Sequence, residues 1–191
     1  AKCHRSKDGT ERIEARVQPT LVSASSLLAK VDGAMNAVEV RGNAVGPTLY
    51  YGAGAGEMPT ASAVVGDLME IAREIRRGGS GPVPPLSYRP EHIAAKAVMP
   101  DAELSGRAYL RMTACDEPGV LGQVTSLLGE EGVAIDTAMT RPQGGGANGL
   151  VSIIILTRRT REDALQRALE AISALAEISE APRSMGIEEE A

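Results

Sequence analysis

The sequence contains no phenylalanine and no tryptophan, and only four of its 191 residues are tyrosine. Aromatic rings ordinarily supply a large share of buried apolar area, so a core of this chain must be built from Val, Ile, Leu, Met and Ala. Cysteine is equally scarce: Cys3 and Cys115 are too few and too widely spaced for a disulfide framework. The two histidines, His4 and His92, have none of the spacings of zinc ligands. We therefore expect neither disulfide bonds nor a metal site.

The sequence also lacks an excess of positive charge and any long apolar run. The formal net charge is −5, which disfavours nucleic acid as a partner because binding phosphate chains requires clustered Lys and Arg. No apolar run approaches the ~18 residues of a membrane span, and the first residues contain no hydrophobic signal segment. We therefore expect a cytoplasmic protein that binds neither nucleic acid nor membrane. Because the chain opens at Ala1 without an initiator methionine, we also expect it to be a piece of a longer protein.

Three alternating glycines form the most informative segment, Tyr51-Gly52-Ala53-Gly54-Ala55-Gly56, and an amphipathic helix follows them. Glycine lets the backbone approach a ligand closely and adopt positive φ, and the helix directs its unpaired N–H groups back at the loop. This arrangement is typical of a backbone-built site for a cofactor or an anion. The spacing matches neither a phosphate-binding P-loop nor G-x-G-x-x-G. On spacing alone, a tight strand-to-helix turn packed on its own sheet is an equally good interpretation.

The first half of the chain reads as short strands followed by this helix. Alternating polar and apolar residues over 12–22 predict a half-buried strand, and residues 36–51 predict a hairpin that turns at 41–44. Pro59 suits the first turn of the helix, and Gly78 is expected to end it. A Gly/Pro-rich joint at 78–85 then separates the two halves.

The second half reads as strand, helix, strand, strand, helix, strand, which is the ferredoxin-like order. A helix is expected from Val120 to a stop at Gly132, and a capping box of Thr160 and Asp163 is expected to open the second helix. The expected strands span residues 108–114, 133–140, 150–157 and 183–188.

The turn between the first of these strands and its helix, Asp116-Glu117-Pro118-Gly119-Val120-Leu121, is similar to that of an ACT domain over roughly residues 107–189. ACT domains pair edge to edge and bind an amino acid near this turn. The resemblance therefore implies effector-binding residues, which are Asp116, Gly119, Val120 and Leu121. The alternative is a ferredoxin-like dimerisation module that binds no ligand.

The first half resembles the end of the catalytic domain of homoserine dehydrogenase, on the residues Asn36-Ala37-Val38, the glycine segment, Pro59-Thr60-Ala61-Ser62 and Gly66-Asp67-Leu68. The resemblance implies an α+β chain: the C-terminal fragment of an α/β catalytic domain, with a mixed sheet and helices, followed by the ferredoxin-like ACT domain. The domain boundaries that it implies are 1–78, a connecting segment at 79–106, and 107–191.

This resemblance also implies an activity, the reversible hydride transfer between NAD(P)H and L-aspartate 4-semialdehyde that gives L-homoserine. Threonine, methionine and isoleucine synthesis depend on this reaction. Gly56 would lie at the nicotinamide cofactor, and Gly52 and Gly54 would shape the same turn. No segment matches the family's Rossmann glycine motif or its catalytic lysine, so no catalytic residue is assigned. The expected partners are the homoserine or semialdehyde substrate, an amino-acid effector such as threonine, and further copies in a homodimer or homotetramer.

The alternative interpretation is a stand-alone ACT-type module that senses amino acids or dimerises without catalysis. The glycine segment and its Pro59-Thr60-Ala61-Ser62 helix start favour the dehydrogenase, because a sensor has no need of a turn that faces a cofactor.

Overall fold

The computed structural model describes residues 1–5, 8–79, 87–143 and 149–189. The chain divides into two compact units, one made of residues 1–23 with 96–191 and the other of residues 24–95. The N-terminal segment therefore belongs to the same unit as the C-terminal half. The predicted boundaries at 1–78, 79–106 and 107–191 concern domains of a complete enzyme and stay a prediction. Residues 80–85 of the predicted Gly/Pro joint lie outside the described residues.

A mixed sheet forms the centre of the first unit, with its strands in the order β3-β11-β7-β9-β8. β3 runs parallel to β11, the other neighbours are antiparallel, and β10 adds to the free part of β7. The strands are β3 (Thr20–Leu21), β7 (Ser105–Cys115), β8 (Ile135–Pro142), β9 (Leu150–Thr157), β10 (Thr160–Arg161) and β11 (Ile178–Ile187). Without β3 and β10, the order along the chain is strand, helix, strand, strand, helix, strand, so the ferredoxin-like prediction is confirmed.

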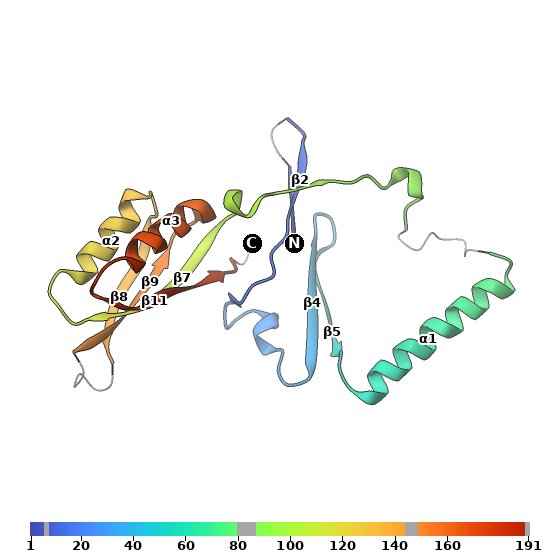
Figure 1. The fold of residues 1–191 in the computed structure, drawn as a ribbon. Helices are drawn as coiled ribbons and strands as arrows, with labels where there is room; N and C mark the ends of the chain where they lie inside the picture. Colours follow the sequence, from blue (N-terminus) through green and yellow to red (C-terminus); the bar gives the residue numbers. More distant parts are fainter. Residues whose placement is uncertain (6–7, 80–86, 144–148, 190–191) are drawn as a thin grey trace. The chain divides into compact units, whose positions relative to one another are not determined.

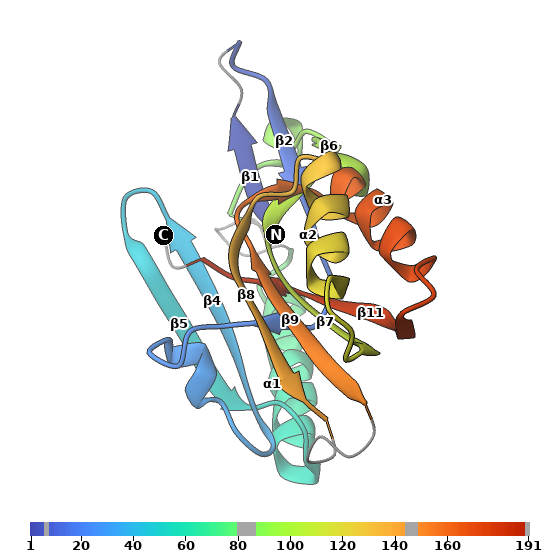
Figure 2. The ribbon, with the colours of Figure 1, turned by 90° about the vertical axis from the view of Figure 1, so that its left-hand side faces the viewer.

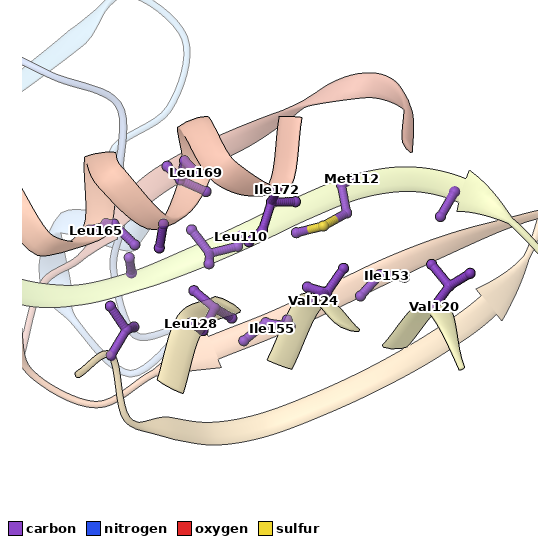
Figure 3. Packing of buried hydrophobic residues seen from close by; sticks show 14 of the residues in the cluster. Leu110, Met112, Val120, Val124, Leu128, Ile153, Ile155, Leu165, Leu169 and Ile172 are labelled. Atoms are coloured by element: carbon purple, nitrogen blue, oxygen red, sulfur yellow. The ribbon is translucent and has the colours of Figure 1, made fainter. Parts of the chain in front are cut away.

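Two helices, α2 (Val120–Glu130) and α3 (Glu162–Ser173), cover one face of this sheet (Figures 1 and 2). The core lies between the helices and strands β7 and β9, as Figure 3 shows. Its largest fully buried side chains are aliphatic or sulfur-containing, apart from one threonine: Leu110, Met112, Val124, Leu128, Ile153, Ile155, Thr157 and Ile172. The composition had predicted such a core without aromatic rings.

The N-terminal segment forms a small second sheet in the same unit, in the order β1-β2-β6. Its strands are β1 (Lys2–Arg5), β2 (Glu11–Glu14) and β6 (Ala97–Val98), and the 3₁₀ turn η3 (Asp101–Glu103) follows it.

The prediction of one strand over 12–22 is wrong, because strand pairing stops at Glu14 and resumes only at Thr20 in β3. The intervening side chains turn to the large sheet instead. Arg16 Nη2 donates to the carbonyl oxygen of Ser105 at 3.2 Å. The Gln18 amide covers Gly186 so closely that a Cβ there would lie 2.6 Å from Nε2. Between Glu14 and Thr20, these side-chain contacts stand in place of the backbone hydrogen bonds that a continuous strand would make.

The second unit contains the predicted hairpin, made of β4 (Met35–Gly42) and β5 (Gly46–Ala53). Pairing continues to Gly42 opposite Gly46, so the turn lies slightly later than predicted, at residues 43–45. The remaining elements are the 3₁₀ turns η1 (Leu27–Lys30) and η2 (Pro90–His92) and the long helix α1 (Glu57–Arg76). The helix α1 starts and ends where Pro59 and Gly78 predicted.

The predicted capping box of α3 is wrong. Thr160 pairs with Gly106 as part of β10, and the residue at the N-cap is Arg161, which makes no side-chain cap. The carboxylate of Asp163 instead forms a two-pronged ion pair with the Arg161 guanidinium, at 2.8 and 3.0 Å. A charge-assisted pair of this kind is stronger than a neutral cap. Both oxygens of the Asp163 carboxylate accept from Arg161, so the carboxylate does not complete a capping box with Thr160.

Candidate functional site

The glycine segment connects β5 to α1 in the second unit. Gly52 is still paired with Asn36 of β4, and Gly56 is the N-cap of α1. Gly56 has φ 131° and ψ 154° and makes no side-chain cap. The backbone therefore leaves the hairpin and enters the helix through five residues that are all exposed to solvent.

Two of the three glycines are required by the turn itself. A Cβ on Gly54 would lie 2.3 Å from Asn36 Nδ2, so the Asn36 amide occupies the place of a side chain. A Cβ on Gly56 would lie 3.3 Å from Pro59 Cδ, at a φ that L-residues rarely adopt. At Gly52 a Cβ would meet nothing within 4 Å, so the fold gives no reason for that glycine. The sequence showed no sign that Asn36 supports the turn, because the contact depends on hairpin register.

The charge at the start of α1 decides which ligand the segment suits. Thr60 N–H already donates to the Gly56 carbonyl at 3.1 Å, and Pro59 has no N–H. Glu57 and Met58 are the remaining first-turn donors, and Glu57 brings a carboxylate to the positive end of the helix dipole. A phosphate would be repelled there. An uncharged group such as a nicotinamide ring or its carboxamide fits better. Of the two ligand classes predicted for this segment, a cofactor group is therefore favoured over an anion.

The second predicted site is the turn between β7 and α2. Gly119, in the left-handed conformation with φ 98°, is the N-cap of α2. The turn is tied at its start by Asp116 N–H, which donates to the Gly149 carbonyl at 2.8 Å. Asp116 and Gly119 are exposed, Leu121 is half-buried, and Val120 is buried in the core. The side chain of Val120 therefore cannot reach a ligand, and its backbone N–H already donates to the Glu117 carbonyl at 3.4 Å.

The start of α2 has the opposite electrostatic character from the start of α1. Its first turn contains no acidic residue, so the dipole and the unpaired N–H groups remain available to a carboxylate. The exposed carboxylate of Asp116 lies just before it in the chain and is suited to an ammonium group. These two groups match the two charges of a free amino acid.

An ion cluster in the N-terminal sheet was missed by the sequence analysis. Glu14 is only 6% exposed, and its carboxylate accepts from Arg16 Nε at 2.7 Å and contacts His4 Nε2 at 2.7 Å. Burial alone would raise the pKa of Glu14, but the hydrogen bond with His4 and the charge of Arg16 outweigh burial and hold that pKa below its usual value. The cluster fixes Arg16 against Ser105, so it joins the two sheets of this unit. No local spacing could have indicated it, because strand pairing brings His4 to Glu14.

Within the described ranges, no helix has the length and apolar character needed to cross a membrane. The same residues include no group of three or more His, Cys, Asp and Glu side chains that could hold a metal ion.

Comparison with known proteins assigns both halves of the chain. Residues 1–69 match the family model described as homoserine dehydrogenase, and residues 108–177 match the model described as ACT domain. The homoserine dehydrogenase of Neisseria gonorrhoeae is 47% identical over 163 residues, which are 85% of this chain and 37% of that protein. That of Pseudomonas aeruginosa is 42% identical over 166 residues, which are 87% of this chain and 38% of that protein.

Among solved structures, a homoserine dehydrogenase from Thiobacillus denitrificans superimposes with a TM-score of 0.79 at 39% identity. The superposition covers 97% of this chain and 41% of that one. The chain thus spans about two fifths of the length of these relatives and corresponds to their C-terminal region. Homoserine dehydrogenases use NAD(P) as their cofactor.

Proposed function

Since the chain belongs to the homoserine dehydrogenase family and includes an ACT domain, we propose that it forms the C-terminal part of an enzyme that oxidises L-homoserine to L-aspartate 4-semialdehyde. The observation that carries this proposal is the glycine turn from Gly52 to Gly56, within the segment that matches the dehydrogenase family. A regulatory module alone would not need this turn, so the alternative of a stand-alone sensor explains less of the chain.

The residues of this chain contribute one wall of the proposed cofactor site. The nicotinamide of NAD(P) accepts or delivers the hydride when it is bound. Gly54 and Gly56 keep the backbone of the turn free of side chains, and the Asn36 amide supports the turn from the hairpin. Glu57 disfavours a phosphate at this end of α1, so the pyrophosphate would be held elsewhere in the complete enzyme. We assign no acid or base to this chain.

The apolar stripe of α1 supports the view that other parts of the enzyme complete this site. Val64, Leu68 and Ile71 are each more than half exposed, and no residue of α1 is buried. A helix with an uncovered stripe of this length is an interaction surface. We infer that the longer polypeptide typical of the relatives covers it.

The regulatory part of the proposal concerns the ACT half. The turn at Asp116 and Gly119 would bind an amino-acid effector, with its carboxylate at the start of α2 and its ammonium at Asp116. Threonine is the effector that we propose, because the proposed reaction leads to threonine. We further propose a homodimer or homotetramer, since ACT domains pair with one another, and a cytoplasmic location, where NAD(P)-dependent biosynthesis takes place.

A direct test measures NAD(P)+ reduction by L-homoserine, through absorbance of the reduced nicotinamide. The complete enzyme should catalyse the reaction, and the 191-residue chain alone should not, because hydride transfer requires a cofactor that is held and oriented by its main binding domain. Homoserine-dependent reduction by the 191-residue chain would contradict the inference that the site is shared with other parts of the enzyme. A complete protein that binds threonine calorimetrically but lacks dehydrogenase activity would favour the stand-alone sensor.

A further inference from the structure

The face of the large sheet opposite α2 and α3 carries an unusual arrangement of arginines. Side chains alternate along β7, so Leu110 and Met112 lie in the core while Arg111 lies on the opposite face. Arg183 of β11 is directly opposite Arg111 in the antiparallel register. Like charges directly opposite on neighbouring strands are destabilising. A bound group of negative charge would relieve that repulsion.

A small hollow lies at this pair, and we call it the arginine hollow. It is lined by Arg111, Met112, Thr113, Glu180, Ala181 and Arg183. The register between β11 and β7 shifts on both sides of Glu180. An irregularity of this kind bends the strand and redirects its side chains, which accounts for a hollow in the middle of a sheet face.

Hydrogen bonds hold the polar groups of the arginine hollow in place. Thr113, only 5% exposed, donates from Oγ1 to Glu180 Oε2 at 3.4 Å and accepts from Gln143 Nε2 at 3.0 Å. Arg111 Nε donates to Ser152 Oγ at 3.3 Å. Among the ion pairs of the described residues, none gives Arg111 or Arg183 a carboxylate partner, whereas Arg107 on the same strand is paired with Asp136 at 2.8 Å.

The charges in the arginine hollow identify the class of ligand. Two guanidinium groups and one carboxylate line the same small space. A phosphate dianion would be attracted by the arginines but repelled by Glu180. A free α-amino acid carries a carboxylate and an ammonium on one carbon, so both of its charges would meet opposite charges.

We propose that the arginine hollow binds a free α-amino acid, with the ligand carboxylate at Arg111 and Arg183 and its ammonium at Glu180. This site lies on the face of the sheet opposite α2 and α3 and is separate from the turn at Gly119. The proposal needs no dehydrogenase reaction, so its failure would leave the proposed activity unaffected.

The test is isothermal titration of the complete protein with L-threonine, L-isoleucine and L-methionine, and with inorganic phosphate. Arg183→Gln and Glu180→Gln should each weaken binding of at least one amino acid about tenfold, the effect of losing one charge-assisted contact. Arg167→Gln is the matched control, because Arg167 is an exposed arginine on α3 that pairs with Glu131. It should leave binding unchanged, and thermal melting should show that all three variants fold.

The N-acetyl derivative of the bound amino acid, which lacks the ammonium, should bind weakly to the parent protein and show no further loss with Glu180→Gln. Three results would overturn the proposal: no heat with any of the three amino acids, binding that Arg183→Gln and Glu180→Gln leave unchanged, or phosphate that binds as tightly as the amino acid. The second result would place any amino-acid binding at the Gly119 turn instead.

Discussion

Gly56→Ala in the complete enzyme tests whether the turn before α1 serves the cofactor. Gly56 has φ 131°, and holding an alanine in a conformation of this kind costs about 1–3 kcal/mol. The added Cβ would also lie 3.3 Å from Pro59 Cδ, at the first turn of the helix. The backbone must therefore move away from its present path. If the displacement costs the bound cofactor the same free energy, KM for NAD(P)+ should rise roughly 5- to 150-fold.

The assay is the initial rate of NAD(P)+ reduction by L-homoserine as the cofactor concentration is varied. Gly66→Ala is the control, because Gly66 lies within α1, and a Cβ there would meet nothing within 4 Å. Alanine favours a helix over glycine, so this control should leave KM and kcat unchanged. If Gly56→Ala changes both constants less than twofold while the protein melts normally, the assignment of Gly56 to the cofactor site is wrong.

Three further predictions concern the ACT half of the chain. Ile155→Ala removes a fully buried side chain from the core and should lower the free energy of unfolding by about 2–5 kcal/mol in urea titrations; a loss below about 1 kcal/mol would mean that the core is looser than described. Gly119→Ala places a Cβ at φ 98° and should weaken threonine binding several-fold in calorimetry, and an unchanged affinity would remove Gly119 from the effector site. The hydrogen-bonded ion pair with Arg161 lowers the pKa of Asp163 from 3.8 to about 2. The folded pKa is the lower one, so the contribution of Asp163 to stability is present above pH 3.8 and is lost as the pH falls towards 2. Asp163→Asn should therefore reduce the pH dependence of urea unfolding in that window, and an identical slope would show that the pair does not stabilise the fold.

Elements with a strong local pattern were predicted well from the sequence. The apolar stripe of α1, the hairpin of β4 and β5 and the strand–helix alternation of the second half each follow from residues close together in the chain. Predictions failed where a distant contact competed with the local pattern. Arg16 and Gln18 bind the large sheet instead of continuing a strand, and Asp163 binds Arg161 instead of capping α3.

The candidate site shows the same division. Glycine at 54 and 56 and the helix after them were evident from the sequence, and the resemblance to homoserine dehydrogenases gave them a cofactor. The support of Gly54 by Asn36 depends on strand register, which brings residue 36 next to residue 54. The preference for an uncharged group at the start of α1 rests on the carboxylate of Glu57, which is visible in the sequence. The structure added that the Thr60 N–H is already bonded to the Gly56 carbonyl.

The sequence by itself determined the hairpin, the long helix after it, the strand–helix order of the second half and the aliphatic core, because periodicity and composition act through neighbouring residues. The family followed from the resemblance of its motifs. Only the tertiary structure decided that residues 1–23 join the C-terminal unit, that His4 meets Glu14, and that Arg111 stands opposite Arg183. Each of these pairs residues that are far apart in the chain or on different strands. The pairing partner and the register of a strand are set by the packing of the whole sheet.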